Sequence, residues 1–491
     1  MPDPIQLPFG AWLPDLPANN NPGALIAKNC IPGPQSYREL RSLASFTDAL
    51  DGPAKGVFWA RNESDTVFAF AGDMTKLYLL DASTSWTDVS QAATTYSADF
   101  WDFVTFENRV LATDGSSNIQ FYDLGLSTTF DDLAGSPPHA KVIGVVRDFV
   151  VLGNIRDDAT FKQDAIAWSG FNNTELWTPS RATQSDRLSL RGNGGAVRRV
   201  VGGQTGFIFQ ENSVQKMDYV GPPTVFRIDE FATSHGTNAS RAVTATKDYV
   251  FYYAMDGFYR LDRRTLEIRP LSADRNQDWF THEIAPAEIF NMVGAAARLH
   301  PIIYWVFRTS SSVTNYDRML IYNWVADRFS YAEIETQFIG GFASTGANLD
   351  TLDTVLGGDI DAASIPVDTN AFAGGVLDLI AFDSDNQAAA FEGPALVAEF
   401  DTTEFGGSGD FIYLDHLRPI VDSAGGTVEV APLTRNGLSA TPVLGSFVSL
   451  NRLGNANVRT NRQYHRYRVR ITGGFEHAQR VEFEPQARGS R

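Results

Sequence analysis

The sequence predicts an all-β protein: a β-propeller of seven blades, with six possible, between an N-terminal extended arm and a C-terminal β-sandwich-like domain. Three observations lead to the propeller. A unit of strand, turn, strand and short third strand recurs along the chain. The first strands of successive units lie about 40 to 60 residues apart, a spacing typical of propeller blades. Aromatic residues make up 12% of the 491 residues, and this enrichment favours strands over helices.

Residues 1–50 are predicted to form a proline-rich extended arm. Prolines stand at positions 2, 4, 8, 14, 17, 22, 32 and 34, and each removes a backbone donor and fixes φ. We therefore expect no long regular element there. Apolar side chains, among them Phe9, Trp12 and Ile31, would anchor such an arm on a folded surface. A solvated, disordered tail is the alternative, and such a tail would lack these anchors.

Residues 51–400 are predicted to form the propeller. Its clearest unit is "FYYAMDGFYRLDRRTLEIRPLS" at 251–272, where Asp256-Gly257 supplies a tight turn between two apolar strands. Similar units lie at 68–90, 110–134 and 302–334, and looser copies at 150–177, 207–228 and 355–383, the last with an insertion. Each small sheet buries its apolar faces only against the sheets beside it, and ring closure leaves short, protected edges. Stacked meanders without ring closure are the alternative.

Two other segments of this region have predicted places. The segment "KGVFWA" at 55–60 precedes the first full unit, and we expect it to close the ring against the last blade. A helical insertion is expected near 272–285, with Ser272 as its N-cap. A helix between two blades would lie on one rim of the ring.

Residues 401–491 alternate apolar and polar positions and predict the C-terminal β-sandwich-like domain. Residues 451–475 carry several arginines and no acidic residue. On a strand, Arg466, Arg468 and Arg470 fall on one face. This face is either a solvated sheet face or, as the functional interpretation, a basic patch that docks an acidic partner, such as another copy of this chain. A DNA contact is the third alternative. The candidate subunit-interface residues are Trp12, Arg459, Arg462, Arg466, Arg468 and Arg470.

Neither charge nor motifs point to an enzyme. The net charge of −18 argues against a protein that grips DNA through its phosphates, but it suits a wall along which DNA slides. Cys30 is the single cysteine, so neither an intrachain disulfide nor a cysteine-based zinc site is possible. The seven histidines form no metal motif, and no G-x-S-x-G or phosphate-binding loop occurs. Acidic pairs such as Asp131-Asp132 could serve a glycosidase or bind calcium, but they are ordinary in turns.

No catalytic, cofactor-binding or metal-binding residue is therefore assigned, and we expect no cofactor. No apolar run approaches the roughly 18 residues that a membrane span needs. The N-terminus lacks the basic start and apolar stretch of a signal peptide, so we expect the chain to fold in a reducing cytoplasm.

The order of the segments resembles that of the packaged-DNA stabilisation proteins of short-tailed bacteriophages, also called tail hub or nozzle proteins. The resemblance runs through "NNNPGALIAKNCIPGPQSYREL", "AGDMTKLYLLD", "VVGGQTGFIFQENSVQKMDYVG", "GTNASRAVTATKDYVFYYAMDGFYRLD", "MLIYNWVADRFSY" and "YHRYRVRITGG". It spans most of the chain and lies in the order of these segments, and residues 348–386 fit least well.

The resemblance implies a structural virion component and no enzyme. The protein would be made in the cytoplasm of the host bacterium and assemble into a ring, usually a hexamer, below the portal and adaptor. The ring would extend the DNA channel, help retain packaged DNA without sequence-specific binding, and anchor tailspikes, fibres or a tail tip.

Two alternatives stay open. One is a β-propeller carbohydrate-active enzyme or receptor-binding tail protein, which would need two or three acidic or aromatic residues at the mouth of the propeller. The other is a soluble bacterial scaffold propeller.

Overall fold

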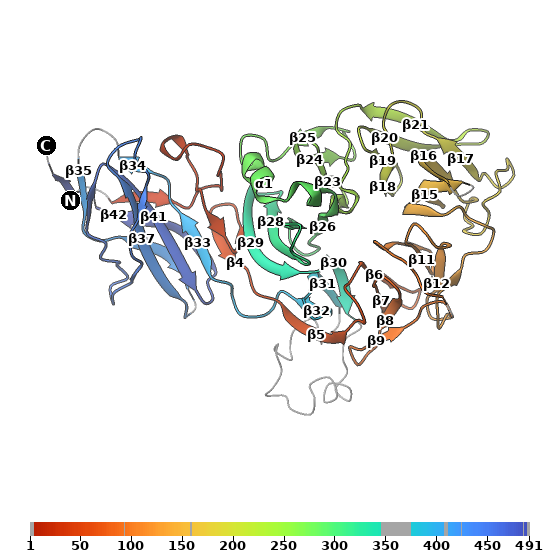
Figure 1. The fold of residues 1–491 in the computed structure, drawn as a ribbon, viewed down its shortest axis with the longest axis horizontal. Coiled ribbons are helices and arrows are strands. Elements are labelled where there is room, and N and C mark those ends of the chain that lie inside the picture. Colours follow the sequence, from red (N-terminus) through yellow and green to blue (C-terminus); the bar gives the residue numbers. More distant parts are fainter. Residues whose placement is uncertain are drawn as a thin grey trace.

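The computed structural model describes residues 4–92, 94–157, 160–344, 375–406, 411–423, 425–484 and 486–488. Seven successive units of four antiparallel strands follow one another around a ring, six as separate sheets and the sixth blade as part of a larger sheet, so the β-propeller prediction is confirmed with seven blades (Figure 1). The predicted hairpin at 251–272 is blade five.

Blade one comprises β6 (Gly56–Arg61), β7 (Val67–Gly72), β8 (Leu77–Leu80) and β9 (Trp86–Asp88). Blade two comprises β10 (Asp102–Phe106), β11 (Arg109–Thr113), β12 (Gln120–Asp123) and β13 (Asp131–Asp132). Blade three comprises β14 (Ala140–Val146), β15 (Phe149–Asp157), β16 (Thr160–Trp168) and β17 (Asp186–Ser189). Blade four comprises β18 (Val197–Val201), β19 (Gly206–Gln210), β20 (Val214–Gly221) and β21 (Val225–Ala232). Blade five comprises β22 (Thr244–Ala245), β23 (Tyr249–Ala254), β24 (Gly257–Asp262) and β25 (Ile268–Pro270). Blade six comprises β26 (Val293–Ala296), β27 (Ile302–Phe307), β28 (Tyr316–Asn323) and β29 (Arg328–Thr336). Blade seven comprises β30 (Phe338–Ser344), β31 (Gly375–Phe382), β32 (Gln387–Ala390) and β5 (Ala44–Ala49).

The ring is closed by β5 from the N-terminal region, which forms the outer strand of blade seven. Ala44 pairs with Ala390, and Ser45 with Ala389. The prediction that 55–60 closes the ring was wrong, because that segment is β6, the first strand of blade one. The mostly polar sequence of β5 hid its role, since Phe46 is its one large apolar side chain. The insertion expected in the last unit falls largely on 345–374, outside the described residues.

The core lies between adjacent blades, as expected for sheets that cover one another's faces. Between blades one and two, the buried rings of Phe70 and Tyr122 lie 5.2 Å apart, edge to face. Between blades four and five, Phe209 and Tyr252 lie 5.0 Å apart. Such aromatic pairs add packing energy to the burial of apolar area, so each blade depends on its neighbours.

The helical insertion is shorter than expected and has a different cap. Helix α1 (Gln277–Glu283) follows β25, and the 3-10 helix η3 (Pro286–Asn291) follows α1; another 3-10 helix, η2 (Ser240–Ala242), precedes β22. Ser272 was predicted as the N-cap, but Asn276 holds that position without a side-chain cap bond. The free N–H groups of Asp278 and Trp279 instead donate to the Asp15 carboxylate, each at 2.8 Å. A residue of the N-terminal arm thus caps this helix.

The remaining elements belong to the arm and the C-terminal domain. They are β1 (Ile5–Pro8), η1 (Ala18–Asn20), β2 (Ala27–Lys28), β3 (Cys30–Pro32), β4 (Tyr37–Glu39), β33 (Ala398–Asp401), β34 (Phe405–Gly406), β35 (Phe411–Leu414), β36 (Arg418–Asp422), β37 (Thr427–Arg435), β38 (Val443–Leu444), β39 (Val448–Ser449), β40 (Thr460–Arg462), β41 (Tyr464–Thr472), β42 (His477–Phe483) and β43 (Gln486–Arg488).

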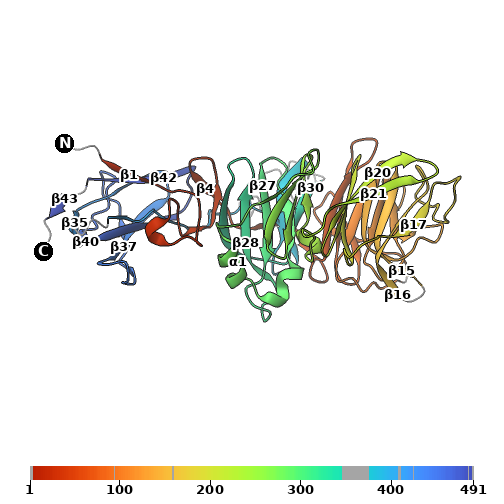
Figure 2. The ribbon, with the colours of Figure 1, turned by 90° about the horizontal axis from the view of Figure 1, so that it is seen from above.

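The arm joins the propeller to the C-terminal domain. β1 and β4 pair with β42, while β2 lies between β29 of blade six and β33. An eleven-stranded sheet therefore runs from blade six through β2 into the C-terminal domain. Figure 2 shows the two parts side by side along the long axis, with the arm beside the C-terminal sheets. Faces of β41 and β42 share one core, which gives the domain its sandwich-like packing.

Candidate functional site: the propeller channel and the predicted interface

The predicted row of arginines lies on one face of β41, but it is not a basic patch. Arg468 donates to both carboxylate oxygens of Asp401, at 2.8 and 3.2 Å, and the Arg466 Nε atom lies 3.5 Å from that carboxylate. Arg470 donates to Glu399 at 2.8 Å. Both acids stand on β33, opposite these arginines in the antiparallel register. The prediction was wrong because the neutralising acids come from a strand about 70 residues earlier in the chain.

Trp12 was also misplaced by the prediction. It is buried in its own chain, donates its indole N–H to the Leu25 carbonyl, and packs edge to face on Trp279 at 4.6 Å. It anchors the arm and presents no surface to another subunit. Arg459 and Arg462 are exposed, with Arg459 lying 3.3 Å from Asp415, and their role at an interface stays a prediction.

A cavity of about 1160 Å³ lies in the central channel of the propeller. The innermost strands β6, β10, β14, β18, β22, β26 and β30, or the residues just after them, all contribute to its wall. An adjoining cavity of about 550 Å³ lies where these strands begin, and Phe100, Arg241 and Phe338 line both. We call the first the channel and the second its entrance.

Cations dominate the walls of the channel and its entrance, although the whole chain is strongly acidic. The cations are Lys55, Arg61, Lys141, Arg198, Arg199, Arg241, Lys247, Arg298 and Arg308. The described acids on these walls are Asp99 and Asp102. Asp102 is buried, lies 2.7 Å from Arg199, and accepts the backbone N–H of Ile143, so it is already neutralised within the fold.

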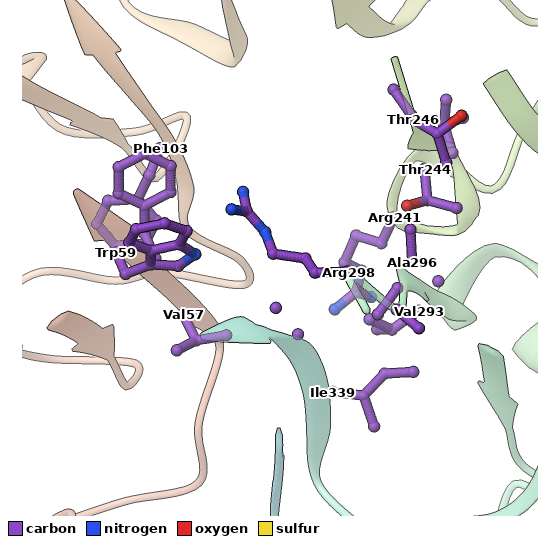
Figure 3. A pocket seen from close by; sticks show the side chains of 18 of the residues that line it. Val57, Trp59, Phe103, Arg241, Thr244, Thr246, Val293, Ala296, Arg298 and Ile339 are labelled. Atoms are coloured by element: carbon purple, nitrogen blue, oxygen red, sulfur yellow. The ribbon is translucent and has the colours of Figure 1, made fainter. Parts of the chain in front are cut away.

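Arg298 extends from the end of β26 across the channel toward Trp59 and Phe103 (Figure 3). Its guanidinium carbon lies 4.3 Å from the centroid of the Trp59 ring, and that of Arg61 lies 5.9 Å from the same ring. Burial lowers the pKa of Arg298, and the charge of Arg61 lowers it further. Arg298 has no ion-pair partner within the part of the chain that the structure describes.

Like charges also crowd the entrance. Burial lowers the pKa of Lys55, and the neighbouring charges of Arg241 and Arg308 lower it further, with Asp99 acting in the opposite direction. Arg241 donates to the amide oxygen of Asn291 at 3.0 Å, a neutral partner. The entrance therefore holds positive charge that the described side chains do not fully balance.

Sequence reasoning missed the channel because its cations are spread over five blades, with one or two on each of blades one, three, four, five and six. The signal would have been basic residues near the start or the end of the innermost strands of these blades. The uneven lengths of the units obscured that pattern.

A third cavity, of about 540 Å³, lies between blade six, blade seven, the arm and the start of β42. The His300 Nδ1 atom lies 2.9 Å from Asp378 there, and charged side chains of both signs line the walls. Among the described residues, no three His, Cys, Asp or Glu side chains are grouped to hold a metal ion. No helix in the described ranges is long and apolar enough to cross a membrane.

The fold and these features define a seven-bladed β-propeller with a basic channel and an appended C-terminal β-domain. No family model and no curated protein matches the chain. A streptogramin B lyase structure is similar with 13% identity and a TM-score of 0.41, over 61% of this chain and 90% of that one. The extracellular domain of a one-component system from B. thetaiotaomicron is similar with 9% identity and a TM-score of 0.43, over 79% of this chain and 44% of that one. The computationally designed Ika8 protein is similar with 11% identity and a TM-score of 0.37, over 71% of this chain and 98% of that one. None of these similarities bears on function.

Proposed function

We propose that this chain is a non-enzymatic structural component of a short-tailed bacteriophage tail, a nozzle or hub subunit of the virion. In this proposal it assembles into a ring of copies, usually six, below the portal and adaptor. The lumen of that ring passes DNA without reading its sequence, and tailspikes, fibres or a tail tip dock on its outside. The order of sequence segments quoted above is the basis for the phage assignment.

The observation that carries the structural role is the stiff connection between the two parts of the molecule. β2 pairs with β29 on one side and β33 on the other, so one sheet crosses from blade six into the C-terminal domain. The arm also caps α1 through Asp15 and pairs β1 and β4 with β42. Two domains linked in this way cannot swing freely, and a spacer in a tail needs that property.

The C-terminal domain offers a surface suited to contacts between copies. β38 is the last strand on its side of the eleven-stranded sheet, and an edge strand can pair with another chain. Val443 and Leu444 on this strand are 68% and 42% exposed, and Leu438 in the preceding turn is 53% exposed. We call Leu438, Val443 and Leu444 the apolar edge, and we propose it as the subunit contact in place of the arginine row.

The test is the assembly state of the full chain, measured by light scattering and negative-stain imaging. We expect closed rings, and we expect Val443→Asp to yield single copies because a charge would enter the apolar edge. Leu126→Asp is the matched control, since Leu126 is 82% exposed in blade two, away from the C-terminal domain. A native chain that stays monomeric at high concentration would refute the proposal, as would a ring unaffected by Val443→Asp.

A β-propeller carbohydrate-active or receptor-binding protein is the second candidate, and the aromatic residues at the channel wall favour it. Trp59 and Phe103 lie there. Hydrolysis of a glycoside requires two carboxylates at a fixed separation, whereas Asp102 is held by Arg199. Release of reducing sugars from bacterial surface glycans by a monomeric chain would favour this candidate over the tail component.

A further inference from the structure

We propose that the propeller channel is a binding site for a phosphorylated small molecule. The starting point is its unbalanced charge. Among the wall residues, Lys55, Arg241, Lys247 and Arg298 have no ion-pair partner in the described ranges. The wall residues Arg198, Arg199 and Arg308, by contrast, each pair with an acid. A chain of net charge −18 has ample acidic residues, yet few of them line this cavity.

The positive charges around Arg298 would favour a bound anion over a channel without one. Arg298 and Arg61 lie near the same indole ring, and burial lowers the pKa of Arg298, with the charge of Arg61 lowering it further. Arg61 is paired with Asp65 at 2.7 Å, whereas Arg298 has no acidic partner in the described ranges. The exposed side chain of Arg298 extends across the channel toward Trp59 (Figure 3). An anion between these groups would relieve the repulsion.

The donors present favour phosphoryl over other anions. A guanidinium offers a planar fork of N–H donors that matches the oxygens of a phosphoryl group, and a phosphoryl group carries enough charge to balance more than one cation. Thr244 and Thr246 lie on the blade-five side of the same cavity, opposite Trp59 in Figure 3, and Lys247, the next residue of the chain, also lines it. A volume of about 1160 Å³ accommodates a small molecule with ordered water around it.

The entrance adds further cations along the axis of the propeller. Lys55 and Arg241 stand where the innermost strands begin, and Arg241 lines both cavities. A ligand with two charged groups could therefore contact cations at both ends. This inference does not depend on ring assembly, because all the residues belong to one chain.

The experiment is isothermal titration of the full chain with inorganic pyrophosphate at low salt. We expect saturable binding that weakens at least about tenfold in Arg298→Gln, because a charged hydrogen bond is lost. A smaller loss is expected for Lys247→Gln. The matched control is Arg264→Gln, which removes the same charge from an exposed turn between the outer strands β24 and β25. Circular dichroism of each variant checks that the fold is intact.

Three outcomes would overturn the proposal. They are an absence of binding by the native chain, equal weakening by Arg264→Gln, and binding that is insensitive to Arg298→Gln. Two further probes test the ligand class. Binding of glucuronate in preference to pyrophosphate would reassign the site to carboxylated sugars. Arg298-dependent binding of a short single-stranded oligonucleotide, without binding of pyrophosphate, would reassign it to nucleic acid.

Discussion

Replacing Arg328 with methionine should release the N-terminal arm while leaving the blades folded. Arg328 begins β29 and is 7% exposed. Its guanidinium donates to the backbone carbonyls of Gly33 and Phe9, both at 2.9 Å, and to that of Gly10. It also lies over the Tyr37 ring, with its central carbon 4.5 Å from the ring centroid. One side chain of blade six thus contacts two stretches of the arm, residues 9–10 and residues 33–37.

The expected effect follows from these bonds. A hydrogen bond to a charged group contributes about 1.5–3 kcal/mol, and carbonyls left unpaired in a buried site add a cost of their own. Because such contributions are not additive, we take about 3 kcal/mol for opening of the arm. At 1.4 kcal/mol for each factor of ten, amide exchange in the arm should become about 150-fold faster.

Hydrogen exchange followed by mass spectrometry is the assay. Peptides covering β1 to β4 should exchange faster in Arg328→Met, while those covering β15 in blade three should not change. Arg269→Met is the matched control, because Arg269 is exposed and its partner Glu267 is only two residues away. An acceleration of the arm below about tenfold, or equal acceleration in β15, would refute the reasoning.

Three more predictions concern stability and reactivity. Asp401→Asn should lower the free energy of unfolding by about 3 kcal/mol in urea titrations, because it leaves Arg466 and Arg468 without their shared carboxylate. A loss of less than about 1 kcal/mol would contradict this prediction. Burial lowers the pKa of His465, whose Nε2 donates to the carbonyls of Ile412 and Arg462. Because this side chain has a higher pKa in the unfolded chain than in the folded one, the unfolded chain binds a proton first as the pH falls below about 6.5. Native stability should therefore decline between pH 7 and pH 5, and His465→Gln should reduce that decline in parallel urea titrations. Burial raises the pKa of Cys30, so Ellman's reagent should label it in urea and leave the native chain unlabelled.

The blades could be predicted from the sequence because their information is local. A turn flanked by aromatic-rich strands, as at 251–272, forms its pairs within about twenty residues, and repetition of the pattern indicates the ring. The apolar surface of an isolated blade requires neighbours, so the propeller follows from repetition.

The features that the sequence concealed all join distant segments. β5 pairs with a strand more than 330 residues later, Asp401 opposes Arg468, and Asp15 caps a helix at Asp278. No spacing rule links such residues, since their proximity is a result of ring closure and of the arm's path. The arginine row shows the consequence: its face was correctly placed, but its charge was misjudged because the partner strand could not be identified.

Closure by β5 has a consequence for how the chain is made. The strand emerges from the ribosome well before its partner β32, which is synthesised about 340 residues later. At about 5–20 residues per second, β5 waits about 20 to 70 seconds with an unsatisfied edge. During that interval six blades can stack in order as a growing arc, but the two ends cannot meet. Translation order thus makes the seventh blade the final joint, and a nascent chain stalled before residue 375 would expose both open ends to neighbouring chains on the same messenger.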